Sequence, residues 1–130
     1  MKLFQTFKKL ITEVVARDEV VRAIQQKQIV IIYYDGDEPG GRGYRTIEPV
    51  CLGELNKSNG TTVTLLRAWD IEGASHTAAK GTQPLPGWRL FNINKISSWR
   101  PTGENFTQAR PNYNFNGDKS LSRVIINAKF

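Results

Sequence analysis

The amino-acid sequence predicts a mainly β protein: a small, strongly bent β-barrel of about five strands, preceded by an amphipathic N-terminal helix. Three observations lead to this prediction. From residue 28 to about residue 100, short runs of β-branched and aromatic residues alternate with turns rich in glycine or asparagine. The first 27 residues instead place apolar side chains at helical spacing. A chain of 130 residues is the size of one domain and can bury a core without disulfides or metals.

Residues 1–27 form the predicted helical segment. Asp18 either caps a second helix or lies within one continuous helix. Two roles are open for the segment, since an amphipathic helix can cover an end of the barrel or bind a partner. The apolar residues that define its stripe are Leu3, Phe7, Leu10, Ile11, Val14, Val20, Val21 and Ile24.

The predicted barrel occupies residues 28–100 and begins with two long strands. The first, "QIVIIYY" at residues 28–34, is apolar enough to be buried on both faces. The glycine-rich turn "DGDEPGGRG" leads into "YRTIEPVCLGEL" at residues 44–55. Pro49 implies that this second strand lies at an edge or carries a bulge, because proline donates no ladder hydrogen bond. "NKSNG" then predicts a hairpin through its Asn-Gly pair.

The remaining strands are shorter. "TTVTLLRAWD" is the third and, after a loop of small residues, "WRLFNIN" at residues 88–94 is the fourth. "KISSW" is either a closing fifth strand or a turn of helix. Residues 101–130 read as a polar extension of loops, anchored to the body by Phe106, Tyr113 and Phe115. Hairpin-linked strands behind a helix favour a barrel of the SH3 or Sm type.

Composition limits the cellular setting and the classes of site. The formal net charge is +6, and the surplus lies in residues 1–28 and 97–130, while residues 29–96 carry seven basic and seven acidic side chains. This charge supports a polyanionic partner only weakly. A single cysteine, Cys51, excludes an internal disulfide, and no apolar run is long enough to span a membrane. We therefore expect a soluble, cytoplasmic protein without a signal peptide.

Three arginines interrupt the apolar alternation of successive strands. Arg45 shares the parity of Ile47, Arg67 that of Leu65, and Arg89 that of Phe91. A guanidinium in an apolar face is costly unless it is paired or reaches solvent. Either each arginine meets a nearby carboxylate at the end of its strand, or the three gather around an anion at one mouth of the barrel.

The order of these motifs resembles the WYL domain, an Sm-like β-barrel of bacterial and phage regulators and defence-associated proteins. The resemblance covers roughly residues 23–100 and rests on "IVIIYYDG", "YRTIEP", "LLRAWD" and "WRLFNINKI". Two positions depart from the family pattern: the naming triplet keeps only a leucine, and a lysine replaces the last arginine. The matching positions are Tyr34, Arg45, Glu48, Pro49, Thr64, Leu65, Leu66, Arg89, Phe91, Lys95 and Ile96.

The resemblance implies a non-enzymatic, stand-alone module that binds single-stranded nucleic acid or a small nucleotide, in regulation or in the contest between phage and host. Arg45, Arg67 and Arg89, flanked by Lys95, are the expected phosphate contacts. Arg42 is either a further contact or a solvated loop residue. Three aromatic residues either stack on bases or pack in the core and rim; these are Tyr34, Trp69 and Trp88.

No catalytic or metal-binding pattern is evident. His76, the only histidine, lies among small residues and is expected to be exposed, and the "DGDE" carboxylates at residues 35–38 read as a solvated turn. We therefore expect no enzyme activity, cofactor, metal or membrane contact. The alternative to ligand binding is a structural or protein-interaction role, in which the N-terminal helix and "SRVIINAKF" contact a partner or a second copy of the chain.

Overall fold

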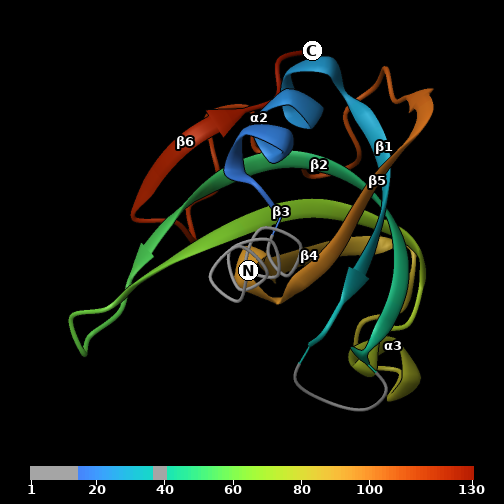
Figure 1. Cartoon of the computed structure of the whole chain (residues 1–130), viewed down its shortest axis with the longest axis horizontal. Helices are drawn as coiled ribbons and strands as arrows, with labels where there is room; N and C mark the ends of the chain where they lie inside the picture. The colour runs from blue at the N-terminus through green and yellow to red at the C-terminus, as the bar shows by residue number, and fades with distance from the viewer. Residues whose placement is uncertain (1–14, 37–40) are drawn as a thin grey trace, which may run out of the picture.

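A computed structural model describes residues 15–36 and 41–130 and shows a mainly β fold (Figure 1). Six antiparallel strands form one open sheet in the order β4-β3-β2-β1-β5, with β6 paired to β2. The mainly β prediction is confirmed. The strands are β1 (Gln28–Tyr34), β2 (Gly43–Asn56), β3 (Thr62–Gly73), β4 (Gly87–Asn92), β5 (Ile96–Asn105) and β6 (Arg123–Asn127).

Helix α2 (Arg17–Gln26) precedes β1 and packs against β1 and β2. Its apolar stripe buries Val20, Ala23 and Ile24, as the spacing predicts. Asp18 lies in the first turn, where a carboxylate favours the helix dipole, and does not cap a second helix. The chain leaves the helix through Lys27, whose left-handed φ of 53° turns it directly into β1. The apolar positions expected at residues 3–14 lie outside the described residues.

The first two strands follow the predicted boundaries. In β1, Val30, Ile32 and Tyr34 are buried and their neighbours are half-buried, so burial of both faces was overestimated. The β2–β3 hairpin forms at the expected Asn-Gly pair, where Gly60 has a φ of 86° and its N–H donates to the carbonyl oxygen of Lys57.

β2 changes partners along one of its edges, and Pro49 lies at the change. Residues 43–47 pair with β1 and residues 51–54 pair with β6, while β3 follows β2 along nearly its whole length. The register with β3 shifts between Pro49 and Cys51. The predicted bulge is confirmed, and it falls where neither β1 nor β6 pairs with the proline, so its missing N–H removes no bond there.

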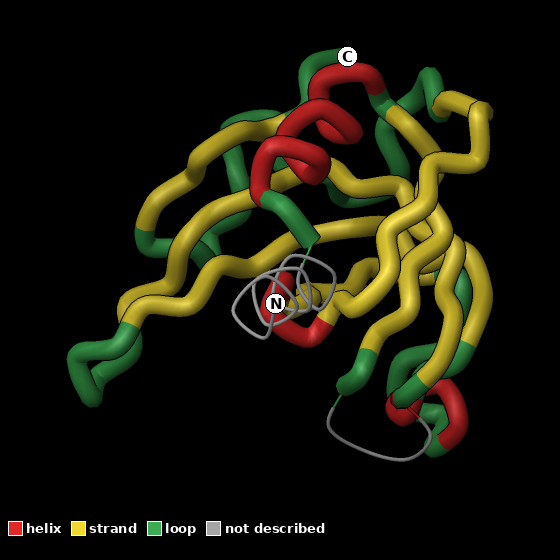
Figure 2. Tube along the Cα trace, in the orientation of Figure 1, coloured by secondary structure: helices red, strands yellow, loops and turns green. Residues whose placement is uncertain are grey.

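The expected closure of the barrel is wrong. A 3-10 turn, Ile93–Lys95, joins β4 to β5, and within the described strands β4 pairs only with β3 and β5 only with β1 (Figure 2). The turn sends β5 along the outer edge of β1 rather than back along β4, so the two end strands do not share hydrogen bonds. Of "KISSW", Lys95 ends the 3-10 turn and the remaining four residues begin β5, so the strand alternative holds for most of it, although this strand does not close a barrel. β5 runs past the expected boundary at residue 100 to Asn105.

The C-terminal extension contributes a strand that the sequence reading missed. β6 extends the sheet beside β2, where Gly53 leaves room for it: a Cβ at this glycine would lie 2.4 Å from the carbonyl oxygen of Arg123. Phe106 is buried as expected, and Tyr113 is half-buried. Phe115 is 65% exposed, so its expected anchoring role is wrong.

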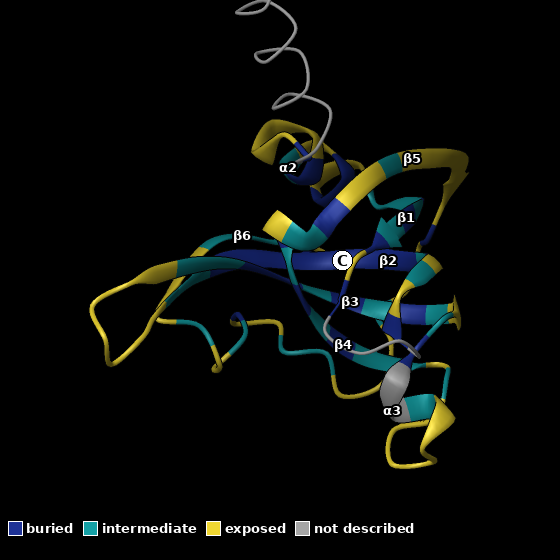
Figure 3. Cartoon of the chain, turned by 60° about the horizontal axis from the view of Figure 1, so that its bottom comes forward, coloured by how far each residue is buried: buried dark blue, intermediate teal, exposed yellow. Residues whose placement is uncertain are grey.

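The core lies on one face of the bent sheet, beneath α2, where Figure 3 shows buried stretches of β2 and β3. Among the described residues, no helix has both the length and the apolarity that a membrane crossing requires. α3 (His76–Ala79) lies in the loop before β4, and the side chain of His76 is outside the described part of the structure. The core side chains with less than 2% exposure include Val20, Ile24, Val30, Ile32, Ile47, Leu52, Leu66, Phe91 and Ile96.

Candidate ligand pocket

The two faces of the sheet separate the predicted site residues into two groups. On β3, Leu66, Ala68 and Asp70 are fully buried and face the core. Arg67 and Trp69 have the opposite parity and therefore lie on the other face. Cross-strand pairing puts Trp88 of β4 opposite Trp69, on the same face.

The C-terminal extension covers this second face and leaves a pocket of about 260 Å³. Strands β2, β3, β4 and β6 and the segment before β6 contribute to it. Two of the predicted ligand residues, Arg67 and Trp88, lie in its wall. The complete lining is Cys51, Arg67, Trp88, Asn112, Tyr113, Asn114, Asp118, Lys119 and Asn127.

Arg67 holds the extension in place and is also part of the pocket wall. Its Nε donates to Oδ2 of Asp118 at 2.5 Å, and its Nη2 donates to Oγ of Ser120 at 3.4 Å. Burial acts to raise the pKa of Asp118, but hydrogen bonds from Arg67 and Ser120 outweigh it and the net pKa is lowered. The side chain of Arg67 remains 25% exposed and lines the pocket.

Two aromatic rings with fixed orientations form another wall. The indole N–H of Trp88 donates to the carbonyl oxygen of Pro111 at 2.7 Å, and the hydroxyl of Tyr113 donates to that of Ala128 at 2.6 Å. The rings are stacked with centroids 6.2 Å apart and planes at 28°. Burial raises the pKa of Tyr113 to about 12, so it remains a neutral phenol. Since the polar end of each ring is tied to the backbone, both rings are held in place.

Asn127 and Cys51 are cross-strand partners in this pocket. The amide nitrogen of Asn127 donates to the carbonyl oxygens of Asn114 and Phe115, each at 3.2 Å. Its Oδ1 is buried and accepts no hydrogen bond from any described residue. Cys51 is 1% exposed, and burial raises the pKa of its thiol. The pocket therefore combines aromatic, cationic and amide groups, while its thiol is unreactive by position and protonation.

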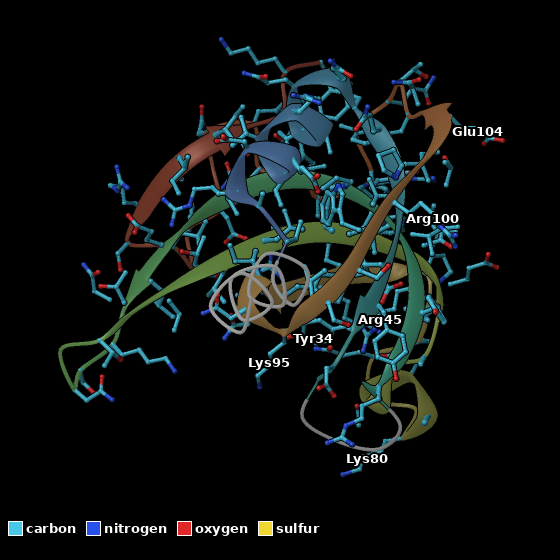
Figure 4. The ribbon with its side chains drawn as sticks, viewed as in Figure 1. Tyr34, Arg45, Lys80, Lys95, Arg100 and Glu104 are labelled. Atoms are coloured by element: carbon cyan, nitrogen blue, oxygen red, sulfur yellow. The ribbon has the colours of Figure 1, made fainter. Side chains whose placement is uncertain are left out.

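Arg45 lies on the core face, away from the pocket lining. Its Nη1 donates to Oδ2 of Asp70 at 3.0 Å, and its Nη2 donates to the carbonyl oxygen of Gly41 at 2.8 Å. The guanidinium also lies over the rings of Tyr34 and Phe91, 5.2 and 5.1 Å from their centroids. With 6% exposure, Arg45 ties the loop before β2 to the core, and Figure 4 shows it beside Tyr34.

Arg89 performs the matching role for the loop before β4. Its Nη2 donates to the carbonyl oxygen of Gln83, and its Nη1 donates to that of Trp88 at 2.9 Å. Burial raises the pKa of Asp70 to about 6, against the attraction of Arg45 and then of Arg89. Arg45 therefore bonds this carboxylate directly, whereas Arg89 attracts it through its charge and bonds backbone carbonyl oxygens. Arg67 pairs with a different carboxylate, so the predicted gathering of three arginines is wrong for Arg67 because it lies on the opposite face.

The other predicted contacts have mixed positions. Tyr34 is 9% exposed, packs edge-on against Phe91 and accepts the N–H of Asn92 at its hydroxyl, so its face is not open to a base. Trp69 is half-buried beneath Arg110, whose guanidinium lies 5.6 Å from its ring centroid.

The two other basic residues that the sequence suggested as phosphate contacts lie close to the end of β1. Lys95 is half-buried in the 3-10 turn, where its carbonyl oxygen accepts the N–H of Asp35 at 2.8 Å. Arg42 forms an exposed ion pair with Asp35 at 3.1 Å. Neither side chain lines the pocket.

The sequence did not predict the polar residues through which the C-terminal extension attaches to the sheet and lines the pocket. Arg110 attaches the extension through a bidentate ion pair with Glu48, with distances of 2.9 and 2.7 Å, and Glu48 is only 2% exposed. Asp118 and Asn127 also come from this extension. The one available signal was the aromatic content of an otherwise polar segment, which led to Tyr113 but not to its polar neighbours.

Nowhere in the described part of the chain do three or more histidine, cysteine, aspartate or glutamate residues gather as a metal site would need. Comparison with known proteins gave no match to a family model, a curated protein or a solved structure. The WYL-like assignment therefore stays a prediction.

Proposed function

We propose that this protein is a non-enzymatic binding module that takes one nucleobase of a nucleotide in the pocket beneath its C-terminal extension. The observation that carries the proposal is the combination in one pocket of the Trp88 and Tyr113 rings with the exposed cation Lys119 and the guanidinium of Arg67, which is paired with Asp118. A planar base stacks on aromatic side chains, and the attached phosphate is attracted to guanidinium and ammonium groups. Aromatic or cationic side chains alone would favour a nucleotide less strongly than the two kinds together.

The size and polarity of the pocket support a small ligand. Pockets for drug-sized molecules hold roughly 300–1,000 Å³, and this pocket, at about 260 Å³, is slightly below that range. It suits one base better than a dinucleotide. The unpaired Oδ1 of Asn127 offers a hydrogen-bond acceptor in a wall whose other polar groups are mainly donors or ion-paired.

The regulatory part of the proposal rests on the WYL-like order of motifs in residues 23–100. We infer a regulatory or phage–host defence role for this module, whose bent sheet is open. Under this proposal Arg45 and Arg89 hold the loops before β2 and β4 in place. The ligand contacts come from Arg67, Lys119 and Trp88.

Fluorescence anisotropy with labelled mononucleotides, measured across a salt series, tests the proposal. Trp88→Ala should weaken binding roughly 5- to 150-fold, since a base–aromatic stack contributes about 1–3 kcal/mol. Lys119→Ala should reduce the salt dependence of binding, because it removes an exposed cation from the pocket. Trp99→Phe is the matched control, since Trp99 lies on β5 and does not line the pocket.

Wild-type protein that binds no nucleotide at low salt would overturn the proposal. So would a folded Trp88→Ala variant with wild-type affinity. A defined oligomer or protein complex in the absence of any nucleotide binding would instead favour the protein-interaction role.

A further inference from the structure

Two exposed aromatic rings pack on Tyr113 of the pocket wall. Tyr113, in the pocket wall, contacts Phe115 with ring centroids 5.0 Å apart and Phe130 with centroids 5.2 Å apart, both edge-on. Phe115 is 65% exposed and Phe130 is 45% exposed. Large aromatic side chains are rarely exposed to solvent as a contiguous group, so we expect this surface to bind a partner. We refer to Tyr113, Phe115 and Phe130 as the aromatic ledge.

Lysine side chains adjoin the aromatic ledge. Nζ of Lys27 lies 5.5 Å from the ring centroid of Phe130, and Lys129 is exposed next to it in the chain. Lys119 lines the adjoining pocket. Asp118 in the pocket wall is ion-paired with Arg67, so this pair adds no net charge to the surface. A partner for this surface must therefore present flat apolar groups together with negative charge.

Unpaired nucleotides have both properties, since each carries a base with two open faces and a phosphate. A folded protein surface with the same charge would lack the repeated planar groups, and a duplex would keep its bases inside the stack. Exposed aromatics combined with lysines are the usual platform for single strands.

We propose that the ligand is a single-stranded oligonucleotide, with one base in the pocket and the following bases stacked on the aromatic ledge. This inference rests on the proposed function, because it uses the same pocket for the first base. It adds that affinity depends on strand length and that Phe115 and Phe130 determine this dependence.

Affinity for labelled oligothymidylates of one, two, four and six nucleotides tests the inference. Wild-type affinity should rise with length and then level off once the ledge is covered. The double variant Phe115→Ala/Phe130→Ala should lose roughly 5- to 150-fold per ring for the longer strands and leave mononucleotide affinity unchanged. Tyr44→Ala is the matched control, because Tyr44 is 61% exposed on β2 and packs on Tyr33 rather than on the ledge. Thermal unfolding checks that each variant is folded, and Phe115→Ala alone serves if the double variant is not.

Each outcome separates the two proposals. Equal wild-type affinity for one and six nucleotides would overturn the role of the ledge and leave the pocket proposal intact. Absence of binding at every length would overturn both. A double variant that keeps its length dependence but loses a homo-oligomer, seen in its native mass, would assign the ledge to protein association instead.

Discussion

Replacing Asp70 by asparagine tests whether the Arg45–Asp70–Arg89 cluster is a costly buried charge or a stabilising one. Asp70 is 0% exposed, and burial raises its pKa from 3.8 to about 6 although two arginines attract the carboxylate. A raised pKa in the folded state means that folding favours the protonated form. Asparagine resembles that form, because it is neutral and its amide oxygen can still accept the hydrogen bond from Arg45.

The sign and size of the effect follow from linkage. Below pH 3.8 Asp70 is protonated in both folded and unfolded protein, and its favourable contribution to the free energy of unfolding is complete. As the pH rises through about 6 that contribution is lost. One pKa unit corresponds to about 1.4 kcal/mol, so the loss is on the order of 3 kcal/mol. The free energy of unfolding of wild type should therefore fall by this amount relative to Asp70→Asn between pH 4 and pH 8.

Urea unfolding followed by tryptophan fluorescence at pH 4, 5, 6 and 8 measures this difference. All other titrating groups, including Asp118 with its lowered pKa, are present in both proteins and cancel in the comparison. Asp35→Asn is the control, since Asp35 is exposed and a surface ion pair such as its pair with Arg42 contributes little to stability. If wild type instead gains stability over Asp70→Asn as the pH rises, the two arginines overcome the cost of burial and the reasoning is wrong.

Three further predictions concern the attachment of the extension and the pocket thiol. Arg110→Ala should lower the free energy of unfolding by roughly 1–3 kcal/mol, because it leaves the carboxylate of Glu48 buried and unpaired, and adding Glu48→Gln should restore part of the loss. A cost below 1 kcal/mol in urea unfolding would contradict this. Gly53→Val should destabilise the protein by more than about 2 kcal/mol and lower nucleotide affinity, since the side chain would displace β6 at Arg123. Unchanged hydrogen-exchange protection of β6 would show that the strand has room. Cys51 should react with a maleimide roughly a thousandfold more slowly in the native protein than in urea, as mass spectrometry would detect, because its reaction requires local opening. Comparable rates in both conditions would show that the pocket exposes the thiol.

The sequence was most informative where one local rule determines the conformation. The Asn-Gly pair specifies the hairpin between β2 and β3, Pro49 marks the interruption in β2, and alternation locates β1 through β4. Each signal acts over a few residues and needs no knowledge of distant neighbours. For the same reason, closure of the sheet could not be predicted, because it depends on where a three-residue turn directs β5.

Local sequence predicted the candidate site less well than it predicted the strands. Parity within one strand correctly separates Arg67 and Trp69 from Asp70, but it does not tell which face is the core. The apolar residues Val63 and Leu65 made the face with Arg67 look like the inner one. That assignment was wrong because the C-terminal extension covers the second face, so apolar residues occur on both sides of β3.

Composition and local pattern alone determined that this chain is a mainly β protein with an amphipathic helix before β1, an interruption at Pro49 in the second strand, and arginines in line with apolar residues on successive strands. The tertiary structure decided which partner each arginine has, since Arg45 bonds Asp70 on the core face, Arg89 bonds backbone carbonyl oxygens, and Arg67 pairs with Asp118 some 51 residues away in the chain. It also decided that the pocket is built against an extension whose own sequence looks like loops. The reason is that a pocket requires contacts between distant segments, and the energy of those contacts comes from burial that no local stretch of sequence contains.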